Sequence, residues 1–86
     1  MPHVYIIEST TAPRWYLGVT SRNLQQRLEE HNRGQTRSTR NFSPWIHIYQ
    51  EEYSTFGDAL KREKYLKSIT GYKERLSIIE IYKQSW

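Results

Sequence analysis

The chain contains no cysteine. This absence excludes disulfide bonds, thiolate zinc sites and cysteine nucleophiles, and it is compatible with a reducing compartment. The amino terminus has neither the basic start nor the apolar stretch of a signal peptide, and no run approaches the ~18 apolar residues that span a membrane. We therefore expect a soluble, cytoplasmic protein with no membrane segment.

The chain also lacks repeats, low-complexity segments and any linker-like stretch. We therefore expect a single domain spanning residues 1–86, with one modest core. Hydrophobic residues make up 36% of the chain and aromatic residues 14%, which is sufficient for a packed globule. Because so small a core leaves little surplus stability, polar side chains at core-facing positions require an explanation.

Negative charge is sparse in the first half of the chain, whose basic residues are mostly arginines. The formal net charge is +4, which suits a polyanionic partner but also occurs in proteins without one. The planar guanidinium fork of arginine suits phosphate oxygens, so nucleic acid is the expected partner. Six arginines fall within 27 residues, opposed there only by Glu29 and Glu30: Arg14, Arg22, Arg27, Arg33, Arg37 and Arg40.

Two short aromatic and aliphatic runs predict a β-hairpin. Residues 3–8 and 14–20 are typical of strands, and the segment between them is rich in turn-forming residues. If Tyr5 pairs with Tyr16, both phenols lie on one face of the sheet, because cross-strand partners point the same way. A register slip of one residue would separate them.

The segment after the hairpin predicts a helix, a loop and a third strand. Ser21 is the expected N-cap of a helix over residues 23–32 that ends at Gly34. Residues 34–43 are polar and basic, which predicts a loop. The alternating pattern of residues 45–49 then predicts a strand.

Two further helices complete the expected fold. Ser54 or Thr55 is the expected cap of a helix over residues 56–68, Gly71 breaks it, and a last helix covers residues 72–83. The fold class expected from these elements is α/β (α+β): a small three-stranded antiparallel sheet flanked by about three helices.

Three polar residues lie on helix faces that should pack against the core. The first helix places Arg27 and His31 on one face with two leucines, Leu24 and Leu28. The second places Glu63 within an apolar stripe. An unpaired carboxylate there costs several kcal/mol, so Glu63 should be paired, metal-bound or at the rim of a cleft. The stripe consists of Phe56, Ala59, Leu60 and Leu66.

Each of these residues also has a purely structural interpretation. Glu63 can pair with Lys67 at a solvated helix edge, His31 can be a hydrogen-bonded core histidine, and Arg27 can pack its stem on apolar surface. The tyrosines can belong to an aromatic core. Gly18 can be a simple strand-end glycine or one that permits close approach of another group.

Taken together, the sequence resembles the GIY-YIG nuclease family. The two strand motifs of that family are matched by Val4-Tyr5-Ile6, with valine in place of glycine, and by Tyr16-Leu17-Gly18, with leucine in place of isoleucine. Residues 23–32 resemble its arginine helix, with histidine one turn later, and residues 59–63 its glutamate-bearing helix. The resemblance covers essentially the whole chain and is greatest to the small stand-alone UPF0213 or YhbQ-like group.

The resemblance implies a divalent-metal-dependent DNA endonuclease of low sequence specificity, of the kind used in repair or recombination of branched or single-stranded DNA. Glu63 would bind one Mg²⁺ or Mn²⁺, weakly before substrate arrives. Tyr5 or Tyr16 would orient or deprotonate the attacking water. Arg27 would hold a phosphate oxygen, and His31 would donate to the same phosphate or relay a proton.

The remaining basic residues have an expected role in binding. Arg33, Arg37 and Arg40 are candidates for contacts to the nucleic acid backbone, which would fix position without reading sequence.

Two other functions remain open at this point. Many family members carry an asparagine after the glutamate, and this chain has none after Asn41. A nucleic-acid-binding module with the nuclease fold and little or no cleavage activity is therefore an alternative. A protein-interaction domain with an aromatic docking surface is a weaker one, and it should lack the steep salt dependence of phosphate binding.

Overall fold

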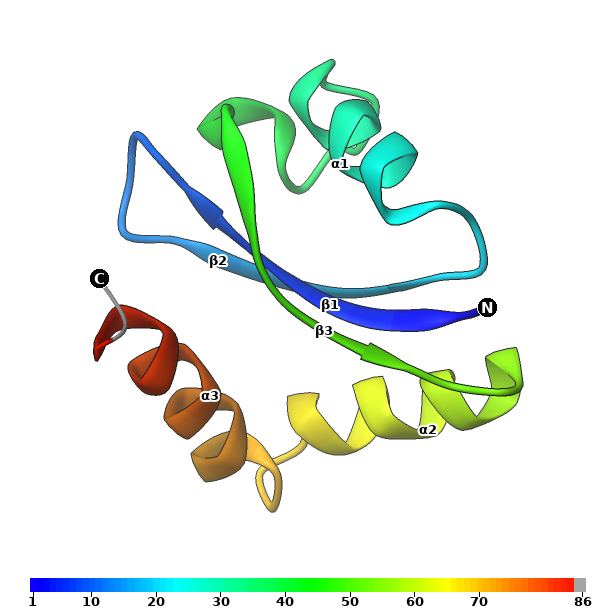
Figure 1. The fold of residues 1–86 in the computed structure, drawn as a ribbon. Helices are drawn as coiled ribbons and strands as arrows, with labels where there is room; N and C mark the ends of the chain where they lie inside the picture. Colours follow the sequence, from blue (N-terminus) through cyan, green and yellow to red (C-terminus); the bar gives the residue numbers. More distant parts are fainter. Residues whose placement is uncertain (85–86) are drawn as a thin grey trace.

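A three-stranded antiparallel sheet separates two layers of helices in the computed structural model, which describes residues 1–84 (Figure 1). The strand order is β2-β1-β3, so the first strand is central. Helix α1 covers one face of the sheet, and α2 and α3 cover the other. This confirms the expected fold class. The elements are β1 (His3–Ser9), β2 (Trp15–Thr20), α1 (Leu24–Asn32), the 3₁₀ helix η1 (Arg40–Phe42), β3 (Trp45–Glu52), α2 (Phe56–Lys67) and α3 (Tyr72–Gln84).

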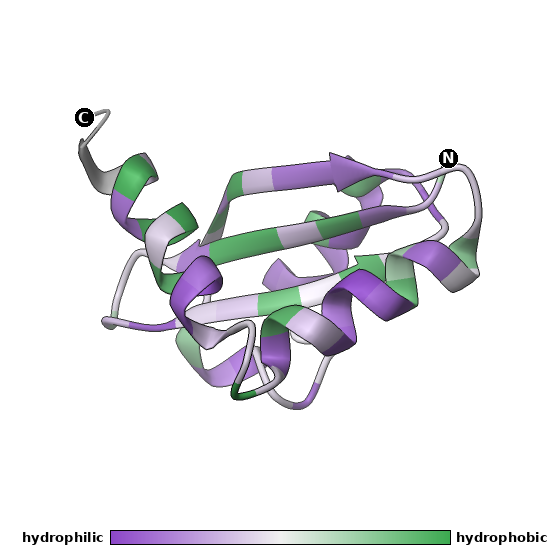
Figure 2. Ribbon diagram, turned by 90° about the horizontal axis from the view of Figure 1, so that it is seen from below, coloured by the Kyte–Doolittle hydropathy of each residue, from purple (hydrophilic) through white to green (hydrophobic). Residues whose placement is uncertain are grey.

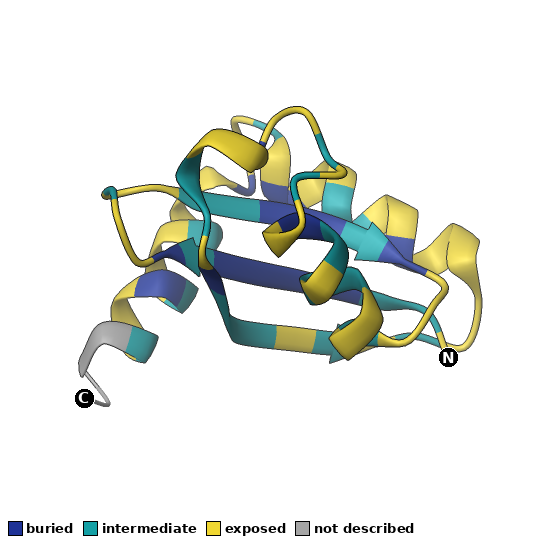
Figure 3. Cartoon of the chain, turned by 90° about the horizontal axis from the view of Figure 1, so that it is seen from above, coloured by how far each residue is buried: buried dark blue, intermediate teal, exposed yellow. Residues whose placement is uncertain are grey.

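The central strand supplies side chains to both layers. Val4 and Ile6 face α2 and α3, whereas Tyr5 and Ile7 face α1. All four are buried, because β1 has a neighbouring strand on each side and helices on each face. Figure 2 shows the apolar stretches of the strands from the side of α2 and α3, and Figure 3 shows the continuous burial of β1 from the side of α1.

The hairpin register differs from the expected one by two residues. Tyr5 pairs with Gly18, and Tyr16 pairs with Ile7. The expected pairing of Tyr5 with Tyr16 was therefore wrong. Both phenols nevertheless lie on one face, because a shift of two residues preserves the alternation of side chains. Their ring centroids are 6.3 Å apart.

The first helix begins two residues later than its expected cap implies. Asn23 is the N-cap, and its side chain accepts hydrogen bonds from the backbone N–H groups of Gln25 and Gln26. Ser21 was therefore the wrong cap. Gly34 follows the end of the helix with a φ of 79°, which confirms its expected role as a helix terminator.

Two other boundaries also differ. The basic segment over residues 34–43 is not wholly a loop, because it contains η1. The third strand continues three residues beyond Tyr49 to Glu52, which pairs with His3 of β1. Of the two expected caps of α2, the structure uses Thr55, which accepts from the backbone N–H of Asp58.

The expected apolar stripe of α2 was only half correct. Ala59 and Leu66 are buried, but Phe56 and Leu60 are 42% and 40% exposed. The helix packs against β1 and β2 with the side that carries Ala59 and Leu66. Glu63 lies between these two residues in the helix and is half-buried. None of the helices in residues 1–84 is long and apolar enough to cross a membrane.

An arginine on the buried side of α2 joins this helix to the third strand. Arg62 donates from Nε and Nη2 to the two carboxylate oxygens of Glu51, at 2.8 and 3.0 Å. It also pairs with Glu74 of α3. The hydroxyl groups of Tyr49 and Tyr53 donate to the same Glu51 carboxylate. This network fixes the position of α2, and hence of Glu63, relative to the sheet.

Gly18 is expected to be intolerant of a side chain. A Cβ atom at this position would lie 2.6 Å from the Tyr5 hydroxyl oxygen and 2.8 Å from a Tyr16 ring carbon. We predict that Gly18→Ala lowers the free energy of unfolding by about 1–3 kcal/mol, as overpacking does, measured by urea denaturation. Gly57→Ala is the control, because the nearest atom to its new Cβ is 4.0 Å away. Equal stability of the Gly18→Ala variant and the unmodified protein would contradict this account.

Candidate active site

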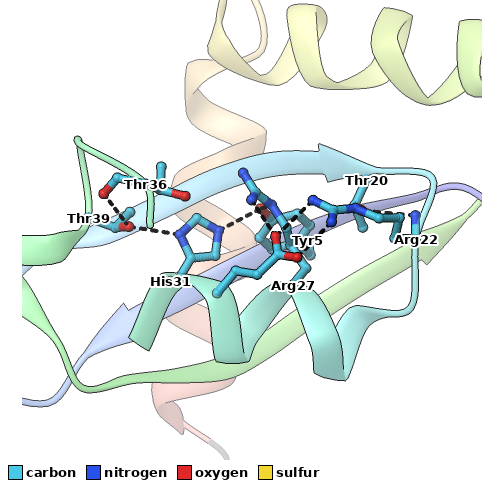
Figure 4. Close-up of polar contacts among 8 residues, drawn as sticks. Tyr5, Thr20, Arg22, Arg27, His31, Thr36 and Thr39 are labelled. Carbon is cyan, nitrogen blue, oxygen red and sulfur yellow. Dashed lines mark hydrogen bonds and ion pairs between the residues drawn. The ribbon is translucent and has the colours of Figure 1, made fainter. Parts of the chain in front are cut away.

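The Tyr5 hydroxyl lies at the centre of a polar cluster between the sheet and α1 (Figure 4). It is 2.8 Å from Nε2 of His31 and accepts a hydrogen bond from Nε of Arg27 at 3.3 Å. One helical turn separates Arg27 from His31, so both side chains reach the same phenol. Gly18, directly opposite on β2, leaves the space in which the Tyr5 ring lies.

His31 is held on its other side by a threonine of the basic segment. Its Nδ1 atom is 2.8 Å from Oγ1 of Thr39, and both residues are fully buried. The Thr39 hydroxyl donates to the backbone carbonyl of Thr36 at 3.3 Å. The Tyr16 ring packs against the imidazole with a centroid distance of 4.9 Å. The histidine is thus enclosed by polar partners at both nitrogens and by an aromatic ring.

Burial sets the protonation states of this cluster. It lowers the pKa of His31 to about 4, and the positive charge of Arg27 adds to this effect. Burial also raises the pKa of Tyr5 to about 12, although the hydrogen bond and charge of Arg27 act in the opposite direction. At neutral pH, His31 is therefore neutral and Tyr5 keeps its proton.

The arginine of the cluster is itself oriented by an acidic residue. Nη1 of Arg27 donates to Oε1 of Glu30 at 2.9 Å. Arg22 donates to both oxygens of the same carboxylate, at 2.6 and 2.8 Å, and hydrogen bonding to Arg27 is the main cause that lowers the pKa of Glu30. The Arg27 side chain remains 22% exposed, and its Nη2 atom makes no hydrogen bond within residues 1–84. This atom can therefore donate to an anionic ligand.

Glu63 reaches the same region from the other layer. Its carboxylate accepts a hydrogen bond from Nζ of Lys67 at 3.2 Å, and that ammonium group is 6.0 Å from the centroid of the Tyr16 ring. The charge of Glu63 also contributes to the raised pKa of Tyr5, which places the carboxylate within electrostatic range of the phenol. Glu63 is thus within electrostatic range of Tyr5, and the structure also contains the Lys67 pair considered from the sequence.

The donor set at Glu63 fits a weakly held magnesium-type ion. The side chain is 20% exposed, so solvent reaches part of it. Among residues 1–84, no group of three or more histidine, cysteine, aspartate or glutamate side chains could hold a metal ion. Mg²⁺ keeps several water ligands and is often bound by one or two carboxylates together with substrate phosphates, so a single glutamate is sufficient.

The three arginines expected to contact nucleic acid are all exposed, but they are not equivalent. Arg33 pairs with Glu29 over 3.6 Å at the end of α1. Arg37 and Arg40 flank Thr39 and form no ion pair within the described part of the chain. Their guanidinium groups are therefore available to a polyanion, in the same segment that holds His31.

Sequence reasoning missed two residues of this cluster. The spacing of Arg27 and Glu30 is one at which helical side chains meet, so periodicity could have identified Glu30. Thr39 gives no such signal, because it lies in a polar segment with no periodicity. Only the folded structure brings it to His31.

The lowered pKa of His31 makes stability dependent on pH. The unfolded chain binds a proton at this residue near pH 6.5, but the folded protein binds it only near pH 4. The free energy of unfolding should therefore be highest above pH 6.5 and fall by about 3 kcal/mol as the pH approaches 4. His31→Gln should remove part of this fall and leave the part due to His47, whose pKa burial also lowers. Urea denaturation across this range, with an NMR titration of the imidazoles, checks this, and a His31 midpoint near 6.5 would contradict it.

Comparison with known proteins agrees with this geometry. A family model described as the GIY-YIG catalytic domain matches residues 1–76, which include every residue of the cluster. Proteins named UPF0213 from Staphylococcus aureus strains Mu3, Mu50 and N315 are each 38% identical to this chain over 72 residues, covering 83% of this chain and 85% of theirs. No solved structure matches the chain significantly. The chain belongs to the GIY-YIG catalytic domain family.

Proposed function

We propose that this protein is a divalent-metal-dependent endonuclease that hydrolyses phosphodiester bonds in DNA with low sequence specificity. One observation carries the proposal: Tyr5, Tyr16, Arg27 and His31 form one contiguous cluster, within electrostatic range of Glu63. A repair or recombination substrate, such as branched or single-stranded DNA, is part of the same proposal. Membership of a family of catalytic domains supports it.

Arg27 is proposed to bind the scissile phosphate. Its Nε and Nη1 atoms are used by Tyr5 and Glu30, so its orientation is fixed before substrate arrives. Its Nη2 atom makes no hydrogen bond within residues 1–84 and can donate to a phosphate oxygen. A donor fixed in advance stabilises developing charge at low reorganisation cost.

The two tyrosines are proposed to have different roles. The Tyr5 hydroxyl accepts from Arg27 and lies 2.8 Å from His31, so it is fully engaged. The Tyr16 hydroxyl makes no hydrogen bond within residues 1–84, and its ring is only half-buried. We therefore assign contact with the attacking water to Tyr16. Tyr5 and His31 then keep Arg27 in position through the hydrogen bonds that join the three side chains.

Glu63 is proposed to hold the metal ion. A bound Mg²⁺ or Mn²⁺ would supply positive charge to the phosphate oxygens. Lys67 is the cation paired with Glu63 in this structure, so a metal ion must compete with it. This competition supports weak metal affinity without substrate.

DNA is proposed to extend from this cluster along the basic segment. Arg37 and Arg40 are exposed, and the net charge of the protein is +4. Contacts of this type are to the sugar–phosphate backbone, which accounts for the proposed low sequence specificity.

Removal of the Glu63 carboxylate tests the proposal most simply. We expect the unmodified protein to nick labelled branched, single-stranded or duplex DNA in Mg²⁺ or Mn²⁺. Glu63→Ala should reduce the cleavage rate by at least about 100-fold while DNA binding is retained. Glu80→Ala is the control, since Glu80 is an exposed carboxylate on α3. Nicking that survives Glu63→Ala would indicate a contaminant and refute the proposal.

A nucleic-acid-binding module without cleavage is the second candidate. The pairing of Glu63 with Lys67 favours it, because this carboxylate already has a cation partner. The same experiment separates the two functions: this candidate predicts binding that weakens steeply between ~50 and ~200 mM salt, with no nicking by the unmodified protein. Binding that is insensitive to salt would exclude both.

A further inference from the structure

Thr39 differs in burial from the residues next to it in the basic segment. Its sequence neighbours Ser38 and Arg40 are exposed, whereas Thr39 is fully buried. Its backbone carbonyl accepts a hydrogen bond from Nε1 of Trp45 at 2.8 Å, and its backbone N–H donates to the carbonyl of Thr36 at 3.2 Å. The residue is thus fixed on both sides, and its hydroxyl is aimed at His31 (Figure 4).

The hydrogen bonds around His31 are all satisfied by one arrangement of protons. The Arg27 Nε–H group can only donate, so the Tyr5 oxygen accepts from it and the Tyr5 proton goes to Nε2 of His31. The Thr39 hydroxyl donates to the carbonyl of Thr36, so its oxygen accepts from Nδ1–H of His31.

The other tautomer would leave the Tyr5 hydroxyl proton without an acceptor. With its proton on Nε2, His31 would donate to Tyr5, and the buried Tyr5 hydroxyl proton would have no acceptor within residues 1–84. With Nδ1 unprotonated, the Thr39 hydroxyl would donate to it instead of to Thr36, and the Thr36 carbonyl would keep only the backbone N–H donors of Thr39 and Arg40. A buried donor without a partner costs about 1–3 kcal/mol, which favours the first tautomer.

We propose that Thr39 is a positioning residue: its hydroxyl holds His31 in the tautomer whose Nε2 atom accepts the Tyr5 proton. Thr39 is buried against His31, and the exposed arginines Arg37 and Arg40 lie before and after it in the chain. Thr39 can therefore act on His31 without touching substrate. The same short segment therefore orients His31 from its buried side and presents Arg37 and Arg40 to solvent. Its effect on cleavage rests on the proposed function, but its effect on the histidine does not.

The effect on His31 can be measured without any activity. Long-range ¹H–¹⁵N NMR spectra distinguish a protonated ring nitrogen from an unprotonated one. In the unmodified protein at neutral pH, we expect Nδ1 of His31 to carry the proton and Nε2 to lack it. A proton on Nε2 would overturn the proposal directly, whether or not any variant folds.

Three variants then test whether the threonine hydroxyl is the cause. Thr39→Val keeps the side-chain shape but removes the hydroxyl, and we expect His31 to populate both tautomers or the opposite one. Thr39→Ser retains the hydroxyl and should restore the original pattern. Thr36→Val is the matched control, because the Thr36 hydroxyl makes no hydrogen bond within residues 1–84 and only its backbone carbonyl is used.

Cleavage kinetics provide the second readout. With DNA as substrate, Thr39→Val should lower kcat about 10-fold with little change in KM, and Thr39→Ser should recover most of this loss. A Thr39→Val variant with unchanged His31 tautomer would overturn the proposal, and so would a Thr39→Ser variant as defective as Thr39→Val. If no protein cleaves DNA, the proposed function fails, but the NMR comparison still decides the role of Thr39.

Discussion

The burial of the Tyr5 hydroxyl beneath α1 is the constraint on which the rest of this structure depends. A phenol at this depth must find hydrogen-bond partners inside the protein, because only 2% of the residue is exposed. Arg27 and His31 supply them from one helical face, and Thr39 supplies the partner that His31 in turn requires. One buried hydroxyl is thereby linked through hydrogen bonds to α1, to a histidine and to the basic segment.

Burial in this region lowers the pKa of His31 and raises the pKa of Tyr5. Burial keeps His31 neutral and Tyr5 protonated at neutral pH, so the resting cluster carries positive charge only on Arg27. That arrangement is well suited to an anionic ligand, because a phosphate would meet a fixed cation, and the neighbouring anion Glu30 already accepts from Arg27. Stability and the proposed ligand recognition would thus depend on the same hydrogen bonds.

The helix layer on the other face of the sheet, α2 and α3, contributes Glu63 to the proposed site. The pairing of Arg62 with Glu51 fixes α2 against the sheet, and the next residue along the chain is Glu63. Glu63 therefore lies within electrostatic range of Tyr5, although α1 and α2 cover opposite faces of the sheet and pack in different cores.

Periodicity made most of this arrangement predictable. The alternation of the hairpin strands placed Tyr5 and Tyr16 on one face, and the helical repeat placed Arg27 and His31 together, since both patterns depend only on local geometry. The hairpin register was not predictable in this way, because it depends on the fit of the Tyr5 ring over Gly18.

Contacts made by irregular segments lay beyond such patterns. Thr39 reaches His31 only because the basic segment folds back and ends in η1, and no repeat marks the one buried position among its polar neighbours. The exposure of Phe56 and Leu60 has a similar origin. The sequence shows that a helix is amphipathic, but the sheet decides which part of its apolar stripe is covered.

The central claim is that the hydrogen bond between Tyr5 and His31 holds this site together, and a double-mutant cycle tests it most directly. Unfolding free energies would be measured for Tyr5→Phe, His31→Leu and the double variant at neutral pH. Each single change leaves a buried polar partner unsatisfied, so the double variant should be more stable than the sum of the single effects by about 1–3 kcal/mol. Additivity within about 0.5 kcal/mol, as expected for residues that do not interact, would contradict the claim.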